Sequence, residues 1–201
     1  MKLHFNPNQS YQLDAIRAIT DIFKGQELEN ADISLHITNG ILSETGLGNT
    51  LSINEEQILK NVKEIQQRNK IDNKTSDLQG MNFSVEMETG TGKTYVYLRT
   101  IYELNKLYGF RKFAIVVPSI AIREGVLKNL QITHEHFQSL YDKTSLSFEV
   151  YDSKKVSNLR SFALSNAIQV LVLNIDAFAK DENIINKPND KLLLLAKRKA
   201  S

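Results

Sequence analysis

The chain has 201 residues, of which 41% are hydrophobic and 24% are charged, a balance typical of a soluble globular protein with an ordinary core. Its net charge of +2 does not by itself indicate nucleic-acid binding. The absence of cysteine excludes disulfides and thiolate metal sites and suits a reducing cytoplasm. No apolar run approaches membrane-spanning length, and residues 1–7 lack a secretory apolar core.

The first predicted element is a helix from Asn8 to Lys24, with Asn8 or Ser10 as its cap and Gly25 as its end. Its apolar residues recur at intervals near three and four, which places them on one face: Leu13, Ile16, Ile19 and Phe23. We therefore expect residues 1–25 to form an N-terminal helical unit.

Residues 26–80 are more polar and contain several turn signals. Residues 33–37 alternate as a short strand would, and Thr38-Asn39-Gly40 favours a turn. The glycines at 46 and 48 are not followed by Lys-Thr, so a loop or hairpin tip is favoured over a second phosphate site.

A second helix is predicted from Glu55 to Arg68, with Asn54 as its cap. Ile58, Val62 and Ile65 fall on one face of this helix, and a polar linker follows up to Gly80. We interpret residues 26–80 as an insertion on the surface of the core.

A glycine-bearing loop occupies residues 86–94, with the sequence Glu-Met-Glu-Thr-Gly-Thr-Gly-Lys-Thr. It follows a short apolar strand at 83–85 and precedes a helix from Thr94 to Tyr108 that ends at Gly109. Backbone N–H groups at such a helix start point at an anion, which suits a triphosphate. The predicted phosphate-binding residues are Glu88, Thr89, Gly90, Thr91, Gly92, Lys93 and Thr94.

The match to the phosphate-loop pattern G-x-x-x-x-G-K-[ST] is incomplete. Gly92, Lys93 and Thr94 fit, but Met87 stands where the first glycine would be. Lys93 can reach the terminal phosphates, and the Thr94 hydroxyl can hold Mg²⁺. The strand–loop–helix context favours a phosphate loop over a chance Gly-Lys-Thr.

Strands and helices alternate after the loop, which predicts an α/β fold with a mostly parallel sheet flanked by helices over residues 81–180. The apolar run Lys112–Val117 is typical of a buried parallel strand. The remaining predicted elements are helix Ile120–Tyr141, strand Ser147–Tyr151, helix Asn158–Asn166 and strand Ile168–Leu173.

Ligands of such sheets bind at the carboxyl ends of the strands. Three stretches lie at strand ends and are expected to share one rim: Glu88, Pro118-Ser119 and Asn174 to Asp176.

For the basic cluster at 197–199, a solvated helix end is favoured over contact with phosphate backbone. His134 and His136 diverge on a helix, so they do not predict a metal site.

Four stretches occur in an order that resembles the first motor domain of superfamily-two helicases. They are Tyr11-Gln12-Leu13-Asp14-Ala15-Ile16, the loop 87–94, Ala114 to Val126 and Leu171 to Phe178. The Met-Glu-Thr-Gly-Thr-Gly-Lys-Thr loop, the insertion before it and Pro-Ser-Ile-Ala-Ile-Arg-Glu-Gly are similar to the restriction (Res) subunit of type III restriction–modification enzymes. Met at the first loop position is usual in that subfamily.

This resemblance implies an incomplete RecA-like domain that binds ATP and Mg²⁺. Gln12 matches the glutamine that reads the adenine edge, a task for which an amide supplies one donor and one acceptor. Tyr11 and Phe5 would then pack on the base.

The resemblance also assigns contacts with the backbone of double-stranded DNA. Pro118 and Ser119 match one such motif, and Arg123 would reinforce it electrostatically. Pro118 can also simply end a strand. Asn174 and Asp176 match a second motif, or else they cap the short helix that follows, and both interpretations stay open.

The acidic part of the family's catalytic site has no counterpart in the sequence. An apolar strand followed by Asp-Glu should supply the Mg²⁺ carboxylate and position the attacking water, and no such stretch occurs. We therefore expect an N-terminal portion of an ATP-dependent type III site-specific deoxyribonuclease, whose sequence specificity lies with a modification (methyltransferase) subunit. For these residues alone, three hypotheses remain: an ATPase, a nucleotide- and DNA-binding module without turnover, and an inactive product that aggregates.

Overall fold

The computed structural model describes residues 4–28, 37–38, 41–42, 48–72, 75–78, 80–152, 162 and 165–178. Its elements in chain order are α1 (Ser10–Thr20), η1 (Asp21–Phe23), β1 (Ile37–Thr38), β2 (Ile41–Leu42), α2 (Glu55–Arg68), α3 (Lys93–Tyr108), β3 (Lys112–Val117), α4 (Ile120–Leu140), β4 (Leu146–Val150), β5 (Ile168–Asn174) and η2 (Ile175–Phe178). Most of the predicted helix 158–166, most of the predicted strand 33–37 and the tail 181–201 lie outside the described residues.

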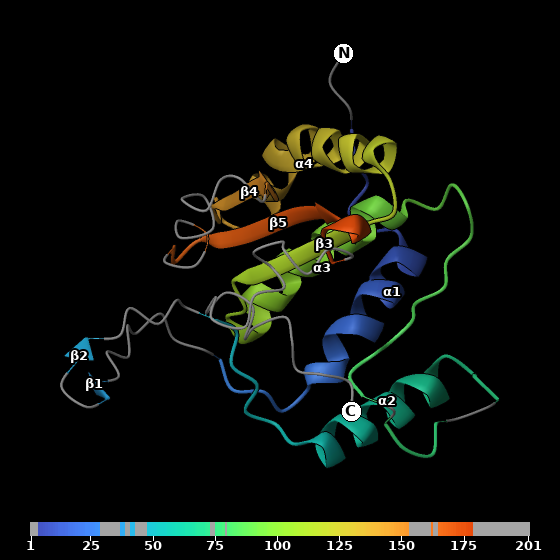
Figure 1. The fold of residues 1–201 in the computed structure, drawn as a ribbon. Coiled ribbons are helices and arrows are strands. Elements are labelled where there is room, and N and C mark those ends of the chain that lie inside the picture. Colours follow the sequence, from blue (N-terminus) through green and yellow to red (C-terminus); the bar gives the residue numbers. More distant parts are fainter. Residues whose placement is uncertain are drawn as a thin grey trace.

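A parallel sheet with the strand order β3-β5-β4 forms the centre of the molecule (Figure 1). Both pairings of β5 are parallel, with Lys112 beside Gln169 in one and Leu146 beside Ile168 in the other. The predicted α/β class, with a parallel sheet and flanking helices, is confirmed. A separate antiparallel pair, β1 and β2, has Thr38 beside Ile41, on either side of the predicted turn.

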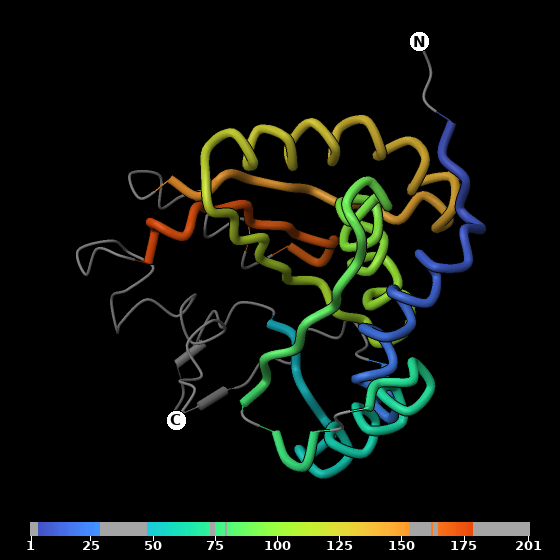
Figure 2. The backbone as a smooth tube through the Cα atoms, turned by 90° about the vertical axis from the view of Figure 1, so that its right-hand side faces the viewer, coloured from blue at the N-terminus to red at the C-terminus, as the bar shows by residue number. Residues whose placement is uncertain are grey.

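The main core lies between one face of the sheet and the helices α3 and α4. Val170 and Val172 of β5 are fully buried there, against Leu98 and Phe137 from the two helices. Figures 1 and 2 show α4 running along the sheet, whereas α1 and α2 lie on the other side of α3. The core therefore fixes the start of α3 relative to the strand ends.

The strand β3 is parallel as predicted, but the prediction that it is buried is wrong for part of its length. Val116 is 47% exposed, and Ala114 is also exposed. The physical reason is the strand order, because β5 is the described neighbour of β3 on one side and no described strand lies on the other.

The strand predicted at 83–85 is not formed. Phe83 and Val85 are exposed, and residues 82–88 carry no described strand pairing. Figure 2 shows this segment as an extended stretch that leads to the start of α3. Apolar residues alone do not make a strand, since a ladder needs a neighbouring edge with which to pair.

The helix ends follow the predicted signals in most cases. Asn54 caps α2 by accepting a hydrogen bond from the Gln57 N–H, and Gly109 ends α3 with a φ of 74°. The capping of the first helix by Asn8 or Ser10 is wrong, because its N-cap is Gln9, which makes no side-chain cap bond. Asn8 instead donates its backbone N–H to the Asn6 side chain.

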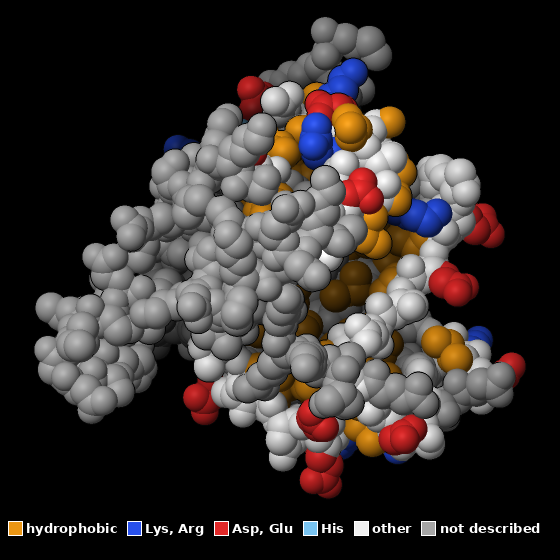
Figure 3. All heavy atoms as spheres, in the orientation of Figure 1, with side chains coloured by type: hydrophobic (Ala, Val, Ile, Leu, Met, Phe, Trp, Pro, Cys, Tyr) orange, Lys and Arg blue, Asp and Glu red, His pale blue; other side chains and the backbone are white. Residues whose placement is uncertain are grey.

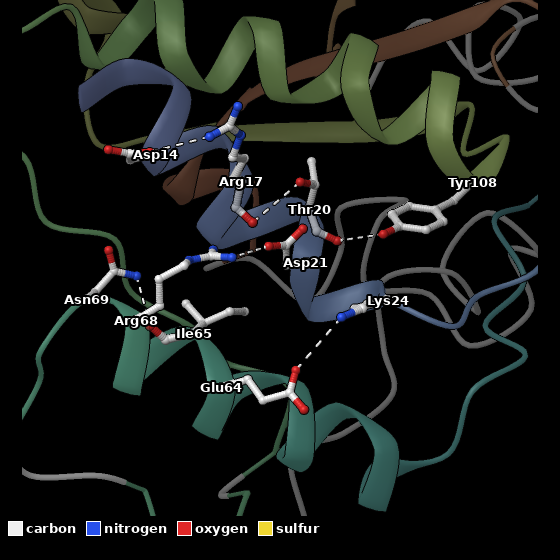
Figure 4. Close-up of polar contacts among 10 residues, drawn as sticks. All are labelled: Asp14, Arg17, Thr20, Asp21, Lys24, Glu64, Ile65, Arg68, Asn69 and Tyr108. Carbon is white, nitrogen blue, oxygen red and sulfur yellow. Dashed lines mark hydrogen bonds and ion pairs between the residues drawn. The ribbon is translucent and has the colours of Figure 1, made fainter. Parts of the chain in front are cut away.

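The helix α2 packs beneath the end of the first helix (Figure 4). Ile58 and Val62 bury their side chains against Ile22, which gives this pair of elements its own small core. Arg68 makes an ion pair of 2.6 Å with Asp21 at the edge of that contact. Exposed pairs of this kind contribute about 0–1 kcal/mol, so the apolar contact dominates the docking of α2.

Candidate nucleotide-binding site

The loop before α3 contains two glycines in the left-handed backbone conformation. Gly90 and Gly92 have φ values of 82° and 86°, in the left-handed region that favours glycine. The helix α3 begins at Lys93, one residue before the predicted start, and its N-cap Gly92 supplies no side chain to the first helical N–H groups. These donors remain available to an anion at the helix N-terminus.

Two side chains of the loop bind back to its own backbone. Lys93 Nζ donates to the Glu88 carbonyl at 2.8 Å, and Thr91 Oγ1 donates to the same oxygen at 2.7 Å. This carbonyl therefore holds the lysine over the loop. Since a lysine has three donors on a flexible stem, Nζ can turn toward a phosphate with little change in the loop backbone.

Gln12 reaches the same loop from α1. Its Nε2 donates to the Thr91 carbonyl at 2.9 Å, and the residue is only 7% exposed. A Cβ atom added at Gly92 would lie 2.7 Å from this Nε2, so the glycine allows the glutamine to approach the backbone. The structure thus brings Gln12 and the loop together across the long interval that separates them in sequence.

A cavity of about 590 Å³ joins these residues. Its lining consists of His4, Phe5, Asn6, Gln9, Gln12, Thr89, Gly90, Gly92, Lys93, Thr94, Tyr95 and Asn129. Phe5 lines the cavity, and its packing on a base stays a prediction. Tyr11 does not belong to the lining and is 46% exposed, so the cavity gives no support to its predicted place beside the base.

An aromatic cluster behind the cavity was not predicted. Phe5 stacks on Tyr95 with ring centroids 5.8 Å apart, and Tyr95 Oη shares a 2.9 Å hydrogen bond with His136 Nε2 on α4. Burial, together with the charge of Arg99, lowers the pKa of His136. Single residues spaced this far apart give no local pattern, so only a three-dimensional structure could have identified the cluster.

Arg99 connects the N-terminal segment to α3. Its guanidinium donates to the Pro7 carbonyl and, at 3.0 Å, to the Tyr141 hydroxyl, which in turn donates to Glu103 at 2.6 Å. Arg99 is 8% exposed, so these partners offset the cost of burying its charge. The contact fixes the chain just before α1 and therefore the position of Gln12.

Thr94 is the residue predicted to hold Mg²⁺. It borders the cavity beside Gln12 and also a second cavity beside β3, where it lies near Tyr97. Burial raises the pKa of Tyr97, and a hydrogen bond with Thr94 partly opposes that shift. Within the described ranges, no three His, Asp or Glu side chains come together as a metal site, so the hydroxyl of Thr94 would share the ion with phosphate oxygens and water.

The predicted DNA-contacting residues come together at the carboxyl ends of β3 and β5. Val117 lies beside Asn174 in the register, so Pro118-Ser119 and Asn174 to Asp176 leave the sheet side by side. Pro118 and Asp176 are exposed. Thr94 and Pro118 line the same cavity, which places the phosphate loop close to this rim.

Local contacts refine the predicted roles at the rim. Ser119 caps α4 by accepting a hydrogen bond from the Ile122 N–H, and Arg123 forms a 3.1 Å ion pair with Glu124. Asn174 Oδ1 is buried and has no hydrogen-bond partner, so it does not cap η2. An unsatisfied buried oxygen of this kind is costly.

The fold is a small α/β domain with a parallel sheet, and a cavity lies beside the glycine-bearing loop that precedes α3. The family model described as "Type III restriction enzyme, res subunit" matches residues 6–198. The chain therefore belongs to the family of type III restriction enzyme Res subunits, whose fold is RecA-like, of which the described part is an incomplete example. Among the described helices, none combines the length and the apolar character needed to cross a membrane.

Curated relatives agree with this family. The chain is 30% identical over 175 residues to the EcoPI Res subunit of Escherichia phage P1, covering 84% of the chain and 17% of the relative. It is 29% identical over 160 residues to the EcoP15I Res subunit of Escherichia coli, covering 77% and 16%. The StyLTI Res subunit of Salmonella typhimurium is 40% identical over 110 residues, covering 46% and 11%. The chain thus spans about a sixth of the length of the first two relatives.

Proposed function

We propose that the chain binds ATP with Mg²⁺ as part of the first motor domain of an ATP-dependent DNA translocase in a type III restriction enzyme. The observation that carries this proposal is the single cavity that Gln12, Lys93 and Thr94 share. The first α3 turn and Lys93 would bind the phosphates, and Thr94 would hold the metal ion. Gln12 would read the adenine edge beside Phe5.

On its own, the chain is proposed to bind ATP–Mg²⁺ without turning it over. Phosphoryl transfer to water needs a carboxylate that orients the attacking water, and no described acidic side chain lines the nucleotide cavity. In an enzyme of the relatives' length, hydrolysis would drive movement along double-stranded DNA and serve an endonuclease. Sequence specificity would come from the modification subunit.

A nucleotide titration combined with a phosphate-release assay tests this proposal. The chain should bind a fluorescent ATP analogue in Mg²⁺ and release no phosphate above the buffer level. Lys93→Ala should weaken binding at least tenfold. Lys106→Ala is the matched control, because Lys106 is an exposed lysine near the other end of α3. Equal affinity in both variants would contradict the proposed site, and phosphate release lost in Lys93→Ala would contradict the absence of turnover.

The rim at the ends of β3 and β5 is proposed to contact the DNA backbone through Pro118, Ser119, Arg123, Asn174 and Asp176. Arg123→Gln should weaken binding to a short duplex and lower the slope of affinity against salt by about one. Lys128→Gln is the control, since Lys128 is an exposed cation further along α4. An unchanged salt slope in Arg123→Gln would remove Arg123 from the proposed interface.

A further inference from the structure

The segment before α1 forms one wall of the cavity beside Gln12. Three of its residues, with Phe5 in the middle, line this cavity, although residues 4–9 form no helix or strand. Arg99 holds the later part of the segment through the Pro7 carbonyl. Figure 2 shows the segment, in dark blue, passing beside the later part of α4. Because the segment has no regular backbone hydrogen-bond pattern, the position of the Phe5 ring depends on side-chain contacts.

Two rings from different helices hold Phe5. It stacks on Tyr95 of α3 at an interplanar angle of 18°, and its centroid lies 5.1 Å from that of His136 on α4. The rings of Tyr95 and His136 are themselves 5.6 Å apart, so the three rings contact one another. Centroid distances of about 4.5–7 Å are those at which aromatic side chains attract each other. The rings therefore attach the wall of the cavity to both helices.

A hydrogen bond fixes how the Tyr95 ring is turned. Tyr95 is 8% exposed, and its Oη lies 2.9 Å from His136 Nε2. Burial raises the pKa of Tyr95 more than the charge of Arg99 lowers it, so the hydroxyl keeps its proton at neutral pH. A neutral imidazole can accept a hydrogen bond from this hydroxyl. His136 does not line the cavity itself, and it reaches the cavity through Phe5 and Tyr95.

Burial and Arg99 keep His136 uncharged. Figure 3 shows the common arrangement on one face of the molecule, with charged side chains around a hollow whose depth is hydrophobic. Arg99 departs from this arrangement, because it is 8% exposed and pairs with Glu103 at 3.8 Å. Burial, together with the charge of this guanidinium, lowers the pKa of His136. At neutral pH the imidazole is therefore a hydrogen-bond partner for Tyr95 and not a second cation beside Arg99.

We propose that His136 is a positioning residue for the nucleoside part of a bound nucleotide. It orients Tyr95 through the hydroxyl and supports the Phe5 ring directly, so it shapes the wall beside which the base would lie. The inference rests on the proposed function, in which Lys93 binds the phosphates and Gln12 reads the base. Loss of His136 should then reduce the affinity that comes from the nucleoside and leave the affinity for the phosphates unchanged.

Isothermal titration with ATP and with inorganic tripolyphosphate, both in Mg²⁺, separates these two parts of the affinity. His136→Ala should weaken ATP binding about three- to tenfold and leave tripolyphosphate binding unchanged. His136→Gln should recover part of the loss, because its amide can replace the Nε2 acceptor. His134→Ala is the matched control on α4, since residues two apart lie about 200° from each other around a helix. Its ATP affinity should equal that of the wild-type chain.

Tyr95→Phe tests the same contact with almost no change of volume. It keeps a ring that can stack on Phe5 and removes the hydroxyl, so it should weaken ATP binding about threefold and leave tripolyphosphate binding unchanged. Combined with His136→Ala, it should lose less than the sum of the single losses, because both substitutions break the same hydrogen bond. Urea denaturation shows whether each variant remains folded under the titration conditions.

Several results would overturn this role of His136. Equal losses for ATP and tripolyphosphate in Tyr95→Phe would leave the ring cluster a purely structural role. An unchanged ATP affinity in His136→Ala, or an equal loss in His134→Ala, would also contradict the inference. Equal affinity of the wild-type chain for the two ligands would do the same, while leaving the proposed phosphate site intact. A wild-type chain that binds neither ligand would contradict the proposed function itself, and the inference with it.

Discussion

The sharpest prediction concerns Gly92, where the loop backbone passes beneath Gln12. Gly92→Ala should weaken nucleotide binding for two separate reasons. Its φ of 86° disfavours any residue with a Cβ, and the new Cβ would lie 2.7 Å from Gln12 Nε2. The glutamine would have to move, which would break its hydrogen bond with the Thr91 carbonyl.

The two costs can be separated because Gly90 supplies a matched control. Its φ is 82°, and an added Cβ there meets no atom within 4 Å. Each alanine should therefore carry a left-handed strain of about 1–2 kcal/mol. Only Gly92→Ala adds the loss of a partly buried hydrogen bond, roughly 1–3 kcal/mol further. The expected difference between the variants is about tenfold or more in affinity if the displaced amide also serves the nucleotide.

Titration with a fluorescent ATP analogue measures that difference, and urea denaturation measures the stability of each variant. Gly92→Ala should bind more weakly than Gly90→Ala at equal nucleotide and Mg²⁺ concentrations. Equal affinities for the two variants would refute the reasoning, because they would show that the approach of Gln12 to the loop does not matter. A further check is Gly92→Ala combined with Gln12→Ala, which should lose less than the sum of the single losses.

Three other predictions rest on individual contacts. Gln12→Ala should reduce the preference for ATP over GTP by about 1–2 kcal/mol, measured by competition binding. Asn54→Ala should lower the free energy of unfolding by about 0.5–2 kcal/mol in urea, because it removes the cap of α2. Burial and the charge of Arg99 lower the pKa of His136, so the unfolded chain binds the proton more readily. Stability should therefore fall as the pH drops below about 6.5, the usual histidine value, and denaturation of His136→Phe should show a smaller fall.

Local sequence signals were sufficient for much of the fold. Asn54 and Gly109 mark helix ends through chemistry that acts within a few residues, and both were predicted. The start of α3 after a glycine-bearing loop was also predicted, because Gly-Lys-Thr before a helix is a local pattern. The predicted cap of α1 was wrong because several neighbouring polar side chains compete as local hydrogen-bond partners. The Asn8 N–H is bound to the Asn6 side chain, and the N-cap is Gln9.

Features that depend on distant pairings could not be predicted in the same way. The apolar run of β3 carries no sign that one of its edges lacks a strand, so its exposure was missed. The contact of Asn49 with Lys112 joins a predicted loop to a predicted core strand, and no spacing rule links the two. The family resemblance supplied the proposed role of Gln12, which composition and periodicity alone would have left as a helix-surface residue.

The residues proposed to bind the nucleotide and those proposed to contact DNA are positioned by different parts of the fold. Arg99 near the middle of α3 binds the Pro7 carbonyl, and Tyr108 near its end binds the Thr20 carbonyl at 3.0 Å. These contacts hold α1, and with it Gln12, against the loop. The proposed DNA-contacting rim instead depends on the register of β3 with β5. Thr94 and Pro118 line the same groove, which places the two sets of residues next to each other.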